Sequence, residues 1–95
     1  MANNGYAKGA KREHRSMEVL ESAGFRCFRT AGSHGAFDVI GISATSLLLV
    51  QVKSRDWPGV LETETLREFP VPTNAKKLIH RWRDRQRLPD VKEVV

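Results

Sequence analysis

Two short apolar runs, joined by four small residues, constrain the fold of this chain more than any other feature. Residues 37–42 and 47–53 are apolar at nearly every position, and residues 43–46 separate them. Apolar residues at consecutive positions are typical of central strands that are covered on both faces. The sequence therefore predicts an antiparallel hairpin in the middle of a sheet, and a symmetric loop places Ile42 opposite Leu47.

The register of this hairpin brings three polar side chains to one of its ends. If Ile42 faces Leu47, then Asp38 lies directly opposite Gln51, with Cβ atoms about 4.5–5.5 Å apart. Lys53 is two residues beyond Gln51 and points to the same face. A slip of one residue would separate the three groups, so the prediction depends on the register.

A helix is predicted from Asn3 or Asn4, which are N-cap residues, to about Ala23, with Gly24 after its last turn. Glu13 falls within its apolar stripe, whose other members are Tyr6, Ala10, Met17 and Leu20. An unpaired buried carboxylate is strongly unfavourable. Two alternatives remain open for Glu13: it meets a cation or a donor, or it reaches solvent at the margin of the stripe.

The remaining segments complete a small sheet. Residues 24–30 alternate as a strand does, residues 31–35 form a glycine-bounded loop, and residues 62–69 suit a short helix. The spacing in residues 74–83 fits either a helix or a strand. We favour the strand, followed by a loop at residues 84–89 and a last strand at residues 90–95, because a small sheet gains from further pairing.

Two tryptophans have different expected roles. Trp82 is expected in the core. Trp57 could instead stack on bases or lie in a dimer interface.

These elements predict a single α/β domain over residues 1–95, with a mixed central β-sheet flanked by helices. The chain has 95 residues and a net charge of +5, with an acidic segment at residues 30–73 between two basic ends. Such a charge pattern suits binding of a polyanion together with a divalent cation. Cys27 is the only cysteine, which excludes an internal disulfide. No run is long enough to span a membrane, and we expect a cytoplasmic protein.

The polar end of the hairpin suits phosphodiester hydrolysis. Asp38 offers a hard carboxylate oxygen for Mg²⁺, Gln51 a side-chain carbonyl and Val52 a main-chain carbonyl, and Glu13 would complete the set. Lys53 would stabilise charge that develops on the phosphate. The alternative is a surface salt bridge between Asp38 and Lys53, which contributes only about 0–1 kcal/mol.

The stretch YAKGAKREHRSMEVLESAGFRCFRTAGSHGAFDVIG, followed by LLLVQVKS, resembles the archaeal-type Holliday junction resolvases of the PD-(D/E)XK nuclease superfamily. The resemblance implies a restriction-endonuclease-like core and Mg²⁺-dependent cleavage of four-way DNA junctions by a homodimer. By this resemblance Glu13, Asp38 and Lys53 match the catalytic acids and lysine. Arg29 matches the family's strand-end arginine, which we take as a DNA-binding residue, and Ser33 matches its loop serine, which we take as a member of the catalytic set.

Two positions depart from the family pattern. Gln51 stands where the family has its second acid, so the site loses one negative charge, and we expect weaker metal binding with a preference for Mn²⁺ over Mg²⁺. The Q-x-K spacing is also similar to that of Mrr-type restriction nucleases. His14 stands where the family has arginine, which weakens one expected phosphate contact.

DNA contacts are expected from the loop and from basic residues near it. Backbone amides of Ser33 and His34, between glycines, can approach a phosphate closely. The basic candidates for the DNA backbone are Lys8, Lys11, Arg12, Arg15, Arg29 and Arg55. For any one helix residue, a solvated surface is an equally good interpretation.

We therefore predict a Mg²⁺- or Mn²⁺-dependent, structure-selective DNA endonuclease that cuts four-way junctions. Paired symmetric cuts need two sites related by a two-fold axis, hence a homodimer. No membrane and no small-molecule cofactor are expected, and the short chain is compatible with a virus-encoded protein in a host cytoplasm. The alternatives are a restriction or repair nuclease acting on duplex DNA, a DNA-binding module without catalysis, and a basic RNA-binding protein.

Overall fold

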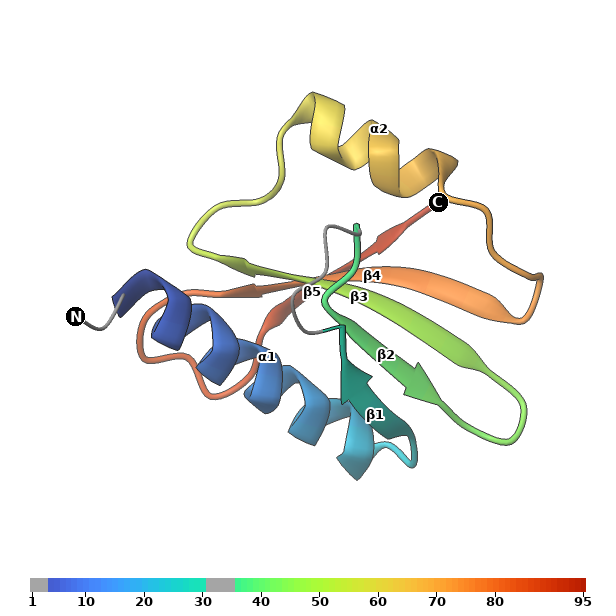
Figure 1. Cartoon of the computed structure of the whole chain (residues 1–95), viewed down its shortest axis with the longest axis horizontal. Helices are drawn as coiled ribbons and strands as arrows, with labels where there is room; N and C mark the ends of the chain where they lie inside the picture. Colours follow the sequence, from blue (N-terminus) through green and yellow to red (C-terminus); the bar gives the residue numbers. More distant parts are fainter. Residues whose placement is uncertain (1–3, 31–35) are drawn as a thin grey trace.

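A five-stranded sheet lies between two helices (Figure 1). The computed structural model describes the backbone of residues 4–30 and 36–95, and the side chains of residues 9–30 and 36–95. The elements in chain order are α1 (Asn4–Ser22), β1 (Arg26–Arg29), β2 (Val39–Ile42), β3 (Leu47–Ser54), α2 (Val60–Glu68), β4 (Ala75–Trp82) and β5 (Asp90–Val94). The strands follow one another across the sheet in sequence order. The pair β3–β4 is parallel with α2 as its crossover, and the other pairs are antiparallel, so the predicted mixed sheet is confirmed.

The register of the central hairpin is the predicted one, with a departure at its open end. Ile42 pairs with Leu47 and Val39 pairs with Val50. The N–H of Asp38, however, donates to the oxygen of Val50 at 2.8 Å, one residue out of that register. Asp38 therefore leaves the regular ladder, and the prediction that it lies directly opposite Gln51 is wrong in detail.

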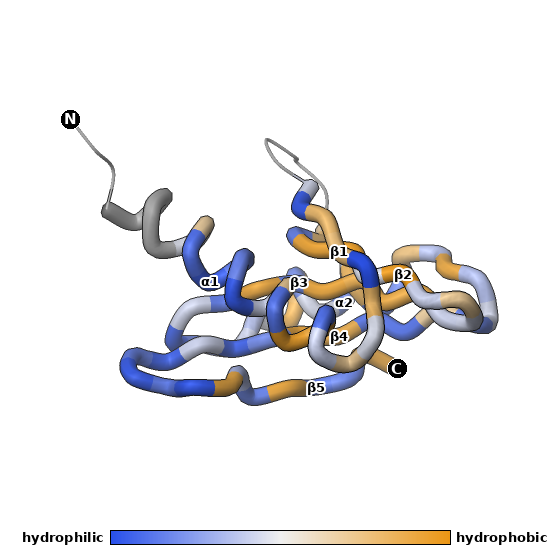
Figure 2. The backbone as a smooth tube through the Cα atoms, turned by 90° about the horizontal axis from the view of Figure 1, so that it is seen from below, coloured by the Kyte–Doolittle hydropathy of each residue, from blue (hydrophilic) through white to orange (hydrophobic). Residues whose placement is uncertain are grey.

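Alternate residues of β3 face two separate cores. Leu49 packs with Leu66 of α2 and Ile79 of β4, whereas Leu48 and Val50 pack with Leu20 of α1. Because side chains alternate along a strand, Gln51 and Lys53 lie on the α2 face and Val52 on the α1 face. In Figure 2 the strands are mainly hydrophobic and lie inside, whereas the described part of α1 and the β4–β5 loop are mainly hydrophilic and lie outside.

Helix α1 ends as predicted, but it is rotated from the expected stripe. Gly24 has φ +97°, and the N–H of Phe25 donates to Leu20 O at 3.1 Å, as in a Schellman cap. The buried side chains of the described part of α1 are Arg12, Ser16 and Leu20. Arg12 and Ser16, which are not members of the expected stripe, are therefore buried against the sheet side of the helix.

The C-terminal segment is β-structure, as we favoured. β4 lies beside β3, and β5 covers the outer edge of β4. Trp82 is buried as expected. Within the described part of the chain, neither helix has the length and apolar character needed to cross a membrane.

Candidate active site

Asp38 stands at the open end of the β2–β3 pair, where side chains from both faces of the sheet act on it. Its Oδ2 accepts a hydrogen bond from the N–H of Val52 at 2.8 Å. Desolvation by burial raises the pKa of the Asp38 carboxyl, the Val52 N–H opposes this, and the charges of Glu13 and Glu62 raise it further, with Lys53 opposing. Asp38 is thus held where its ionised form needs a cation.

Gln51 has one satisfied and one unsatisfied atom. The residue is 7% exposed. Its Nε2 donates to Glu62 Oε2 at 3.0 Å and to the carbonyl of Ala36 at 3.5 Å. Its Oε1 is buried and has no hydrogen-bond partner among the described residues. A buried acceptor without a donor costs about 1–3 kcal/mol, which a bound cation would remove.

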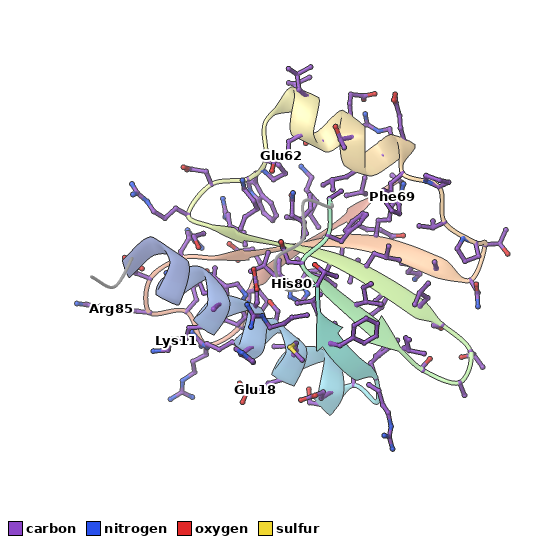
Figure 3. The ribbon with its side chains drawn as sticks, in the orientation of Figure 1. Lys11, Glu18, Glu62, Phe69, His80 and Arg85 are labelled. Atoms are coloured by element: carbon purple, nitrogen blue, oxygen red, sulfur yellow. The ribbon has the colours of Figure 1, made fainter. Side chains whose placement is uncertain are left out.

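Glu62 enters the site from the first turn of α2, on the sheet-facing side of that helix (Figure 3). Its Oε1 accepts from the Nζ of Lys53 at 3.3 Å, while its other oxygen accepts from Gln51. Sequence reasoning placed Glu62 at the start of a short helix but gave it no role. No sequence spacing could have found this contact, because the crossover that folds α2 over β3 decides it.

Glu13 lies on the α1 side of the sheet and meets a cation there. Arg29 Nε donates to Glu13 Oε1 at 2.9 Å, and both side chains are 22% exposed. Arg29 Nη1 also lies 3.4 Å from His14 Nε2. Of the two alternatives for Glu13, the cation partner is confirmed, and its carboxylate acts on Asp38 through its charge.

The donors that could hold a metal ion are of mixed type. Among the described residues, no three His, Cys, Asp or Glu side chains form a group that could hold an ion. The oxygen donors at this strand end are the Asp38 carboxylate, which accepts from the Val52 N–H, the carbonyl of Val52, and Gln51 Oε1, which has no hydrogen-bond partner among the described residues. The N–H and C=O of one strand residue point to the same side, so the Val52 carbonyl lies on the side from which Asp38 binds its N–H. Hard oxygen donors of this kind fit Mg²⁺ or Mn²⁺.

The predicted DNA-binding residues differ in their surroundings. Lys11 and Arg55 are exposed, and Arg55 has φ +74° directly after β3. Arg12 is buried, and its Nη2 lies 2.8 Å from Asp84 Oδ1. Lys8, Ser33 and His34 lie outside the described side chains, so their roles stay predictions.

A basic loop, residues 83–89 between β4 and β5, lies beside α1. Arg15 stacks on Trp82 at 4.4 Å and donates to the carbonyls of Gln86 and Arg87 at 2.8 and 3.3 Å. This holds the β4–β5 loop against the helix. The exposed arginines of this loop are Arg83, Arg85 and Arg87. Their alternation with other residues was visible in the sequence, but the contact of the loop with Arg15 was not.

Comparisons with known proteins identify the family and the fold. The family model of the archaeal Holliday junction resolvases (Hjc) matches residues 4–78. The fold is similar to that of Archaeoglobus fulgidus Hjc, a Holliday junction resolvase from an archaeal hyperthermophile, with a TM-score of 0.73 and 24% identity over 92% of this chain and 73% of that chain. No curated protein matches the chain. The structural likeness confirms the predicted fold, and the family model covers most of the sequence. The chain belongs to the archaeal Holliday junction resolvase family.

Proposed function

We propose that this chain is a divalent-metal-dependent endonuclease that resolves four-way DNA junctions with the site at the open end of β2 and β3. The observation that carries the proposal is that Asp38 binds the Val52 N–H at the strand end where Gln51 and Lys53 share the Glu62 carboxylate, in a member of this family. Gln51 Oε1 is buried there without a hydrogen-bond partner among the described residues. An acid, a neutral oxygen and a cation at one strand end suit phosphodiester hydrolysis.

The roles of the residues follow from their positions. Asp38, Gln51 Oε1 and the Val52 carbonyl would hold Mg²⁺ or Mn²⁺, which supplies Lewis-acid polarisation of the scissile phosphate. Lys53 stabilises the negative charge that develops on the phosphate oxygens. Glu13 holds Arg29 at the rim, where the guanidinium can meet a DNA phosphate. Ser33 completes the catalytic set as a prediction from the resemblance.

The DNA surface extends from the site along α1. Lys8, Lys11, Arg29 and Arg55 are its proposed members, with Ser33 and His34 from the loop, and we add the arginines of the β4–β5 loop. Arg12 is a weaker member, because its guanidinium is engaged with Asp84. Backbone contacts of this type fix position and orientation rather than sequence.

A homodimer is proposed because one chain carries one site, and a junction needs two symmetric cuts. Large apolar side chains remain exposed and would be covered by a second copy, among them Phe28, Ile42, Val60 and Leu61. Sedimentation equilibrium should give twice the mass of the chain; a monomer at all concentrations, with or without junction DNA, would contradict the dimer. A cytoplasmic location stays a prediction.

The test of the function compares three labelled substrates: a four-way junction, a duplex and a single strand, each with Mg²⁺ or Mn²⁺. We expect paired symmetric nicks in the junction alone, and loss of cleavage with retained junction binding in Asp38→Asn. Asp56→Asn is the matched control, since Asp56 is an exposed carboxylate just beyond β3. Equal cutting of all three substrates would remove the resolvase assignment and keep the nuclease. Binding without any cutting would favour a non-catalytic DNA-binding module.

A further inference from the structure

We propose that Glu62, on helix α2, supplies the negative charge that the metal site lacks because residue 51 is glutamine, and that it also sets the orientation of the Gln51 amide. This inference rests on the proposed function, since it concerns the same site. It assigns to α2 a part of the site that the family pattern places on β3.

The first argument is the position of the charge. Glutamine and glutamate have the same shape, so Nε2 of Gln51 occupies the place of one carboxylate oxygen of a glutamate in the same rotamer. Glu62 Oε2 lies 3.0 Å from that nitrogen. A carboxylate is therefore present within hydrogen-bond distance of the point where the missing acid would carry its charge. Lys53, two residues along the strand, meets the same carboxylate at 3.3 Å.

The second argument is the orientation of the amide. A carboxylate only accepts hydrogen bonds, so Glu62 binds the NH₂ end of Gln51 and the oxygen takes the other position. That oxygen is buried and has no hydrogen-bond partner among the described residues, in a side chain that is 7% exposed. A buried acceptor held in this way beside acidic groups is a site for a cation. Without Glu62 the amide could rotate and present its NH₂ group, which repels a cation.

The third argument is that the negative charges of Glu62 and Asp38 lie at the same strand end. Glu62 Oε2 lies at the Gln51 amide and Glu62 Oε1 lies at the Lys53 ammonium, so the Glu62 carboxylate is fixed at the same strand end as Asp38, whose Oδ2 binds the Val52 N–H. Accumulated negative charge at one point is unfavourable in the free protein and is relieved when a cation binds. Glu62 acts on the ion through its charge and through Gln51, which makes it a positioning residue.

The experiment measures Mn²⁺ binding to the full chain by titration calorimetry and electron paramagnetic resonance, apart from any cleavage. The variants are Glu62→Gln, Gln51→Glu and the double variant with both changes. Glu64→Gln is the matched control, because Glu64 lies on the same helix and pairs with Arg67. Asp38→Asn tests the site itself.

We expect Glu62→Gln to weaken Mn²⁺ binding about 10-fold or more, within the range seen when groups behind metal ligands are removed. The double variant should recover to within about threefold of the original affinity, because the charge has moved back to residue 51. Glu64→Gln should bind as the unchanged protein does. Thermal unfolding of each metal-free variant checks that the fold is intact.

The outcomes separate the inference from the proposed function. If Asp38→Asn loses Mn²⁺ binding but Glu62→Gln keeps it, the inference about Glu62 is overturned and the nuclease site stands. If Glu62→Gln weakens binding and Gln51→Glu does not restore it, Glu62 is only a structural partner of Lys53, and the inference also falls. If the unchanged protein takes up no Mn²⁺ or Mg²⁺, the metal-dependent function itself fails.

Discussion

Two polar clusters lie on the parallel strands β3 and β4, and they differ in how far their hydrogen bonds are completed. Under α1, Ser16 Oγ lies 2.9 Å from His80 Nδ1 and 2.8 Å from Trp82 Nε1, and all three side chains are buried. The second cluster, called the open cluster below, lies at the strand end beneath α2 and consists of Asp38, Gln51, Lys53 and Glu62. Its side chains are partly exposed or, among the described residues, only partly paired. Val52 and His80 are register partners, so the two clusters are neighbours.

The difference separates a structural polar cluster from a functional one. The Trp82 indole can only donate, so Ser16 accepts from it and keeps its own hydrogen for His80 Nδ1. This cluster of Ser16, His80 and Trp82, called the closed cluster below, is neutral and joins α1 to the sheet. The open cluster holds charges, a buried oxygen with no hydrogen-bond partner in the part of the chain that the structure describes, and a carboxyl whose pKa is raised by burial. Each of these costs stability until a ligand binds.

The largest effect should come from the open cluster, where activity and stability are expected to change in opposite directions. Asp38→Asn should lower junction cleavage at least about 100-fold. Because the pKa of Asp38 is raised in the fold, its ionised form is disfavoured there, and the neutral amide should increase the free energy of unfolding. Urea denaturation in the absence of metal measures this. A clear loss of stability would mean that Asp38 holds the fold together.

The closed cluster should make the fold sensitive to acid. Burial lowers the pKa of His80 from 6.5 to about 4. As the pH falls, His80 therefore takes up a proton in the unfolded chain before it does so in the folded protein. The free energy of unfolding should be unaffected by this group above pH 6.5 and should fall by up to about 3 kcal/mol as the pH decreases towards 4. Urea denaturation between pH 7.5 and 4.5 should show this slope, and His80→Gln should reduce it. An equal slope in both proteins would assign acid sensitivity to other groups.

Ser16→Ala breaks the closed cluster directly. It leaves the Trp82 indole N–H and His80 Nδ1 without their buried partner, which should lower the free energy of unfolding by roughly 2 kcal/mol. Mn²⁺ affinity of the folded protein should not change. If metal binding weakened along with stability, the two clusters would act as one unit and the distinction drawn above would fail.

Substitutions in the β4–β5 loop test how far the DNA surface extends beyond the open cluster. Arg85→Ala and Arg87→Ala should each weaken junction binding and reduce the slope of log affinity against log salt by about one. Arg67→Ala is the control, because Arg67 lies on α2 and pairs with Glu64. Fluorescence anisotropy across a salt series measures the slopes; equal slopes in all three variants would place the DNA elsewhere.

The smallest effect is expected at Arg55, which has the left-handed φ of +74° that favours glycine. Arg55→Gly should stabilise the fold by up to about 1 kcal/mol. Junction binding should weaken nevertheless if the side chain contacts a phosphate. Thermal unfolding and anisotropy together decide this. Unchanged binding would remove Arg55 from the DNA surface.

The sequence was sufficient for features decided by neighbouring residues. The apolar runs predicted the central hairpin and its register, and the cap at Gly24 was confirmed. For Glu13, which falls within an apolar stripe, one of the two alternatives left open was a cation partner, and that partner is Arg29. Each of these follows from a short pattern and its period.

Features decided by the path of the chain were missed. The contact of Glu62 with Gln51 depends on where the β3–α2–β4 crossover places the helix. Arg12 is buried because Asp84, 72 residues away, lies beside α1. Asp38 steps out of register at a strand end, where a fixed period no longer holds. Long-range packing sets these positions, and no local pattern encodes it.

The attachment of α2 to the sheet is uneven along its length, and this affects the mobility of its first turn. Lys77 Nζ donates to the carbonyls of Leu66, Arg67 and Phe69 at 2.8, 2.6 and 3.1 Å, and Leu66 is fully buried. Val60 and Leu61, in the first turn, are more than 80% exposed. The contacts that hold α2 to the sheet therefore lie mainly at its C-terminal end, and in the first turn they include the hydrogen bonds of Glu62 with Gln51 and Lys53. Hydrogen exchange of the helix should be fastest in that first turn and should slow when an ion binds at the strand end.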